Sequence, residues 1–133
     1  MRTRLNVFLV FLAAALISAV GPAAAQKPSA QSSTAAGVTV KATPRTLSGA
    51  AWEFEIVFDS HTQELKDDLP KSASLIAGGK TLAPAAWQGD PPGGHHREGT
   101  LRFNAIAPRP ESVELQIQRP GESKPRSLRW QLK

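Results

Sequence analysis

Residues 52–59 constrain the fold of this chain more than any other segment. Large apolar side chains occupy every second position, at Trp52, Phe54, Ile56 and Phe58, and the residues between them are mostly acidic. Successive side chains of a β-strand point to opposite faces of its sheet. The alternation therefore predicts a strand with one face on a core and the other in solvent.

The same alternation, or a short apolar run between turn residues, recurs along the chain. It predicts six further strands, at residues 38–42, 73–77, 80–87, 99–105, 112–118 and 126–132. Gly78-Gly79 predicts a two-residue hairpin turn, and Pro84 predicts that the strand around it lies at a sheet edge. The polar residues 60–69 predict a single helical turn, opened by a weak capping box at Ser60 and ended by Pro70.

Seven short strands in about 100 residues predict an all-β fold. The favoured architecture is an immunoglobulin- or fibronectin-III-like seven-stranded sandwich, in which the loop after Trp87 crosses between the sheets. The chain contains no cysteine, so the disulfide of antibody domains is absent and fibronectin type III is the better analogy. A small jelly roll or an open barrel is the alternative.

The N-terminus has the composition of a secretory signal peptide. Arg2 and Arg4 precede an almost entirely apolar run at residues 5–20, and Ala23-Ala24-Ala25 provides small residues for cleavage before Gln26. We expect an exported protein, periplasmic or secreted, without a membrane span after cleavage of residues 1–25. A retained N-terminal anchor is the alternative. Residues 26–37 are rich in Ser, Ala and Gln and predict a disordered lead-in, which leaves 38–133 as one domain.

Composition excludes several classes of function. Loss of Arg2 and Arg4 with the signal peptide leaves 14 basic and 11 acidic residues, scattered along the chain. This pattern lacks the basic stripe of a nucleic-acid-binding protein. The absence of cysteine excludes thiolate catalysis and thiolate metal sites. Ser60, His61 and Asp59 are consecutive and lack a nucleophile elbow or an oxyanion hole, so we expect no enzymatic activity.

Alternate connections of an up-and-down sandwich lie at opposite ends of the molecule. We expect the connections at residues 60–71, 88–98 and 119–125 to share one end, which we call the loop pole. This end receives all three histidines of the chain, at positions 61, 95 and 96.

Two functions fit such a pole. The favoured one is a non-enzymatic accessory module that contacts an envelope or secreted partner through the loop pole, with Trp87, Asp90 and Arg97 as candidate contact residues. The alternative is a divalent metal site for Cu(II) or Zn, a cofactor that the histidines of the pole would ligate together with a carboxylate. The candidate ligands are His61, His95, His96 and Asp59. Asp59 shares a strand face with His61 and is expected to orient its ring.

The segment Trp-x-Gly-Asp-Pro-Pro-Gly-Gly-His-His-Arg-x-Gly-x-Leu-x-Phe at residues 87–103 resembles small exported bacterial β-sandwich proteins of unassigned function. The Trp52 strand and Asp59-Ser60-His61 upstream add to the likeness, which extends from Val38 to the C-terminus. The resemblance implies an exported β-sandwich and brings no activity with it. Periplasmic copper carriers are less similar, because the Met- and His-rich N-terminal ligands that they use are absent here.

Overall fold

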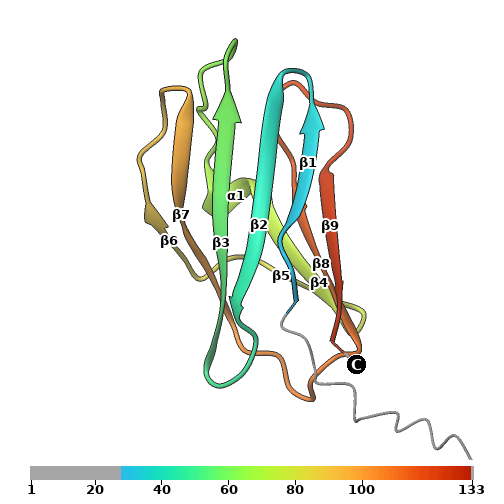
Figure 1. The fold of residues 1–133 in the computed structure, drawn as a ribbon. Helices are drawn as coiled ribbons and strands as arrows, with labels where there is room; N and C mark the ends of the chain where they lie inside the picture. Colours follow the sequence, from blue (N-terminus) through green and yellow to red (C-terminus); the bar gives the residue numbers. More distant parts are fainter. Residues whose placement is uncertain (1–27, 133) are drawn as a thin grey trace, which may run out of the picture.

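A computed structural model of the chain describes residues 28–132. The predicted signal peptide, its cleavage site and the first part of the predicted lead-in lie outside these residues. The described part is all-β, with nine strands in two antiparallel sheets and one short helix. Figure 1 shows the two sheets as layers that face each other. Within residues 28–132 no helix is both long enough and apolar enough to span a membrane.

Both sheets are antiparallel throughout. Across the larger sheet, sheet A, the strands follow the order β1 (Gln31–Ala35), β2 (Val38–Thr46), β3 (Ala51–Ser60), β7 (His96–Asn104) and β6 (Ala86–Gly89). Across sheet B the order is β5 (Lys80–Leu82), β4 (Ala73–Ala77), β8 (Ser112–Ile117) and β9 (Arg126–Gln131). The helix α1 (Leu69–Ser72) precedes β4.

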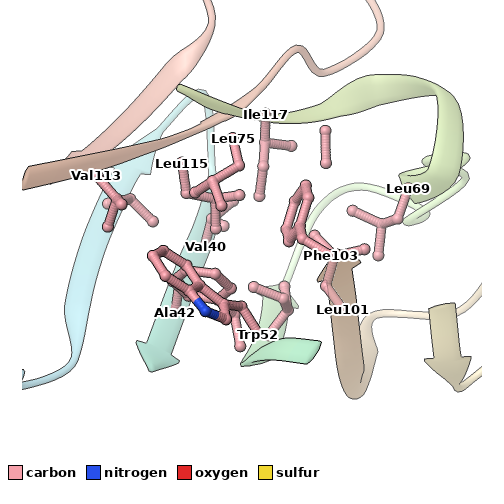
Figure 2. Packing of buried hydrophobic residues seen from close by; sticks show 14 of the residues in the cluster. Val40, Ala42, Trp52, Leu69, Leu75, Leu101, Phe103, Val113, Leu115 and Ile117 are labelled. Atoms are coloured by element: carbon pink, nitrogen blue, oxygen red, sulfur yellow. The ribbon is translucent and has the colours of Figure 1, made fainter. Parts of the chain in front are cut away.

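The core lies between the sheets and confirms the alternation predicted for β3. Trp52, Phe54, Ile56 and Phe58 are at most 2% exposed. Figure 2 shows side chains of sheet B, such as Leu115, facing those of sheet A. Phe54 contacts aromatic rings of both sheets, Phe103 edge-on at 5.9 Å and Trp130 at 5.4 Å between ring centroids. Burial of this apolar surface is the main driving force for the association of the two layers.

The strand predicted at residues 80–87 is two strands in two sheets. β5 pairs with β4 in sheet B, and β6 pairs with β7 in sheet A. The crossing between sheets therefore occurs at residues 83–85 around Pro84, not after Trp87 as predicted. Proline has no N–H to donate to a ladder, so it suits the point where the chain leaves one sheet for the other. Gly78 and Gly79 form the predicted hairpin turn, with φ values of 55° and 76°.

Two other predictions need correction. The disordered lead-in is wrong for residues 31–35, which form β1 and pair with β2. The helical turn forms at 69–72 instead of 60–69, and Pro70 lies in its first turn, where a missing N–H costs nothing. Ser60 Oγ still accepts the N–H of Gln63 at 3.0 Å, so the predicted capping bond exists without its helix.

The β1–β2 turn contains the only non-glycine residue with positive φ among residues 28–132. Ala36 has φ 50° and Gly37 has φ 76°, and Ala35 pairs with Val38 on either side of them. Two central residues with positive φ define a turn of type I′, for which Asn-Gly is the preferred sequence. An alanine in this position is strained, because its Cβ crowds the following carbonyl oxygen.

Ala36→Asn should therefore stabilise the protein, since asparagine tolerates the left-handed conformation. We expect the free energy of unfolding in urea to rise by about 0.5–1 kcal/mol. Ala105→Asn is the matched control, because Ala105 is also exposed but lacks a positive φ. Equal effects of the two substitutions would contradict the assignment of strain to the turn.

Candidate functional site

Backbone hydrogen bonds join the connections of the loop pole, which lies at the top of Figure 1. Leu65 N–H donates to the Gly94 carbonyl at 2.8 Å, and Gly93 N–H donates to the Leu65 carbonyl at 2.7 Å. Ser60 N–H donates to the His95 carbonyl at 2.9 Å. These bonds hold the connection after β3 against the connection between β6 and β7. The predicted gathering of these loops at one end of the molecule is confirmed.

A buried ion pair attaches the third connection to the other two. Asp67 is fully buried and Arg119 is 4% exposed. The guanidinium of Arg119 donates from Nε to Oδ2 at 3.0 Å and from a terminal nitrogen to Oδ1 at 3.1 Å. Such a bidentate pair fixes the relative orientation of the two chain segments as well as their separation.

The ionic network continues toward β1. Glu122 accepts a hydrogen bond from Arg119 at 3.3 Å and two from Arg126, at 2.7 and 2.9 Å. The bonds from Arg126 lower the pKa of Glu122. Arg126 is 5% exposed and also donates to the backbone carbonyls of Ser33 at 2.8 Å and Ala35 at 2.9 Å. Asp67, Arg119, Glu122 and Arg126 thus form a network from the β3 connection to β1, which we call the ionic network.

Arg97 supports the β6–β7 loop from beneath. It is 1% exposed and donates to the carbonyls of Asp67 at 2.7 Å and Asp90 at 3.2 Å. Its Nε is a buried donor without a partner in the structure. Arg97 therefore binds the backbone of Asp90 and not its carboxylate. The prediction of Arg97 as a contact residue is wrong, because its side chain is buried and supports the loop from inside.

Trp87 and two glycines complete the support of this loop. The indole of Trp87 lies 5.8 Å from the Arg97 guanidinium and donates to the Asp90 carbonyl at 3.1 Å. Gly89 and Gly99 are paired across β6 and β7. A Cβ on either glycine would lie 2.5 Å from the backbone of the other strand and 2.8 Å from the Trp87 ring. Glycine is required at both positions because the indole and the backbone fill the space of a side chain.

Asp90 is the residue of this loop with the most partners. Its carbonyl accepts the two donors from Trp87 and Arg97, and its carboxylate accepts the Glu98 N–H at 3.0 Å. The following Pro91 and Pro92 remain exposed. The loop is therefore fixed at its base and presents its tip to solvent.

The three histidines lie on adjacent segments of the pole but differ in environment. His96 Nδ1 lies 2.5 Å from Asp59 Oδ1, and its Nε2 lies 3.2 Å from Glu98 Oε2. Asp59 therefore orients His96, its cross-strand neighbour, and not His61 as predicted. The bond to Asp59 is the largest cause of a raised pKa for His96. His61 and His95 are exposed.

The predicted metal ligands do not assemble into a cluster. Among residues 28–132, no group of three or more His, Asp or Glu side chains is placed to hold a metal ion. Both nitrogens of the His96 ring face carboxylates, an arrangement in which both donate only when the ring is protonated. A protonated ring has no lone pair for a metal. The hypothesis of a Cu(II) or Zn site at His61, His95, His96 and Asp59 gains no support from the structure.

Sequence reasoning missed the buried charges, although a signal for them is present. Arg97 is in phase with the inward residues Leu101 and Phe103 of β7. Arg119 continues the inward phase of β8, Arg126 that of β9, and Asp67 lies midway between the buried Leu65 and Leu69. A charged residue at an inward position of an alternating pattern is the signal of a buried ionic group.

Removal of the carboxylate of Asp67 should be strongly destabilising. Asp67→Asn removes the bidentate counter-charge of the buried Arg119 and leaves it only Glu122, at 3.3 Å, which Arg126 also binds. We expect a loss of about 3–5 kcal/mol in the free energy of unfolding. Glu55→Gln is the matched control, because its partner Arg45 is 56% exposed and exposed pairs contribute about 1 kcal/mol or less. Urea unfolding measures both. Losses of similar size would show that the ionic network is not a principal support of the pole.

His96 should titrate above the ordinary histidine value of 6.5. A pKa raised by folding stabilises the protein below the unfolded pKa, and this contribution is lost as the pH rises through the folded pKa. NMR titration of the His96 ring is expected to give a midpoint above 6.5. Asp59→Asn should lower the midpoint and Glu55→Gln should not. An unchanged midpoint in Asp59→Asn would refute the role of Asp59.

Comparison of the chain with protein-family models, curated proteins and solved structures gives no match. The resemblance inferred from residues 87–103 stays a prediction.

Proposed function

We propose that this chain is an exported, non-enzymatic binding module that contacts an envelope or secreted protein through its loop pole. The observation that carries the proposal is the internal fixation of the pole. The Asp67–Arg119 pair and Arg97 hold the connections together from beneath. Loops fixed in advance lose less conformational entropy on binding, which favours a recognition role.

The outward surface of the pole is suited to a protein partner. It combines exposed rigid apolar groups at Pro91 and Pro92 with polar and charged side chains at His95, Lys66 and Asp90. Interfaces of non-obligate complexes have this mixed character.

The position of the chain ends also supports the proposal. The described chain begins and ends at the bottom of Figure 1, at the end of the molecule opposite the loop pole. The Trp130 indole donates to the Ser29 carbonyl at 2.7 Å and holds the first described residues beside β9. Neither end of the described segment, residues 28–132, lies at the pole.

The strand order supports an immunoglobulin-like assignment of the fold. Sheet A contains β2-β3-β7-β6 and sheet B contains β5-β4-β8-β9, which corresponds to the ABED and CFG sheets of constant-type domains with one added strand at the edge of sheet B. β1 is a further strand at the edge of sheet A. In variable domains of this class, loops at one end of the sandwich carry the binding site.

Substitution of exposed pole residues should abolish partner contact without unfolding the protein. We suggest replacing Lys66, Pro92 and His95 with serine together, and treating envelope and secreted fractions with a crosslinker. The crosslinked species should fall at least about tenfold, as expected when central contact residues are removed. Thermal unfolding verifies that the variant is folded.

The control variant carries Lys80→Ser, Ala105→Ser and Glu111→Ser, which are exposed and outside the loop pole. It should form the same crosslinked species as the unaltered protein. Equal crosslinking by the pole variant, or no species above background in the unaltered protein, would reject the proposal.

A further inference from the structure

The N-terminal strand β1 is attached to the body without burying any of its side chains. All five of its residues, Gln-Ser-Ser-Thr-Ala, are exposed or half-exposed. Each of the other strands of sheet A except the four-residue β6 places at least three residues in the buried class. β1 therefore gains little from the hydrophobic effect, and backbone contacts dominate its attachment.

The rest of the domain, residues 38–132, binds β1 mainly through the main-chain atoms of β1. β2 pairs with it from Gln31 to Ala35. On the other side, Arg126 donates to the carbonyls of Ser33 at 2.8 Å and Ala35 at 2.9 Å. An extended segment from another molecule can satisfy the same donors and acceptors.

Two side-chain contacts nevertheless favour the sequence of β1 itself. Thr34 Oγ1 lies 2.9 Å from Thr39 Oγ1, and Ser33 Oγ accepts from Arg126 at 3.3 Å. A second copy of this chain reproduces both contacts, whereas an unrelated extended segment does not. The position beside β2 that β1 occupies is therefore better suited to β1 of another copy than to a strand of an unrelated protein.

The turn that retains β1 is strained and has free space beside it. Ala36 has φ 50°, a conformation that residues with a Cβ rarely adopt. A hollow of about 420 Å³ lies next to the turn, lined in part by Ala35, Ala36 and Pro125. Opening of the turn relieves the strain at Ala36, and short strained hinges are the known setting for exchange of elements between copies.

We propose that two copies of this chain exchange β1 reciprocally, each strand pairing with β2 of the other copy in the register of the single chain. Residues 36–37 then become an extended hinge between β1 and β2. The exchange conserves the contacts of β1 and removes the strained turn twice per dimer. The inference does not depend on the function proposed for the loop pole. The hinge lies at the same end of the molecule, where Ser60 Oγ donates to the Gly37 carbonyl at 2.9 Å, so the second copy of the dimer approaches from the side of the pole.

Two substitutions in the turn should shift the exchange in opposite directions. Ala36→Asn favours the tight turn and therefore the single chain. Gly37→Val disfavours the tight turn, because Gly37 has φ 76° and its Cβ would lie 2.7 Å from Thr62 Oγ1. An extended hinge accommodates valine well.

A disulfide distinguishes exchanged dimers from all other forms of association. The chain has no cysteine, and Ser32 pairs with Lys41 across β1 and β2. In a variant with Ser32→Cys and Lys41→Cys, oxidation links residues of one chain in the monomer and of two chains in the exchanged dimer. Protein expressed from the full sequence is incubated reduced at high concentration, diluted, oxidised and run on a non-reducing denaturing gel.

We expect a covalent dimer whose fraction rises with the concentration of incubation. Ala36→Asn should lower this fraction severalfold, and Gly37→Val should raise it. The variants with Ser32→Cys alone or Lys41→Cys alone control for collisions between exposed thiols and should give little dimer.

Two outcomes would overturn the proposal: disulfides confined to single chains at every concentration, or covalent dimers that form equally well in the single-cysteine controls. If Gly37→Val lacks a cooperative thermal transition, the comparison between the unaltered turn and Ala36→Asn decides. Equal dimer fractions in these two proteins then reject the exchange.

Discussion

The pairing of buried guanidinium groups with carboxylates and carbonyl oxygens holds the loop pole of this protein together. The chain contains no cysteine, so its loops are fixed without covalent links. Arg119 with Asp67, and Arg97 with the carbonyls of Asp67 and Asp90, fulfil this role. Guanidinium suits it because five N–H donors in one rigid plane can bind several acceptors from different loops at once. A lysine in the same position offers three donors on a single atom and could not join the same segments.

The strands with one buried face could be predicted from the sequence, because burial of one face requires an apolar residue at every second position. β3 and β8 were placed within two residues of their observed ends. β1 was missed because it is stabilised by its backbone and by Arg126, and neither leaves an apolar pattern in Gln-Ser-Ser-Thr-Ala. The division of residues 80–87 between two sheets was missed for a similar reason. Pro84 indicated an edge, but no local pattern states which sheet a strand joins.

The candidate site was predicted to the level of its loops and not to the level of its contacts. The rule that alternate connections lie at opposite ends of the sandwich correctly placed the connections at residues 60–71, 88–98 and 119–125 at one end. The partner of Asp59 depends on the register between β3 and β7, which places His96 opposite it, and register between distant strands cannot be read from either strand alone. The segment at residues 87–103 stands out in the sequence by its Trp, Pro, Gly and His residues. Its unusual residues support the loop: Trp87 occupies the space that the paired Gly89 and Gly99 leave empty.

The location of both ends of the described chain, away from the loop pole (Figure 1), has a practical consequence. A fusion partner, an affinity handle or a surface attached near Pro28 or Leu132 would leave the pole pointing outward, at the greatest reach that the length of the sandwich allows. Attachment through side chains gives no such control, because lysines such as Lys66 and Lys124 belong to the pole itself. Attachment near either end of the described chain therefore leaves the loops of the pole exposed to solvent.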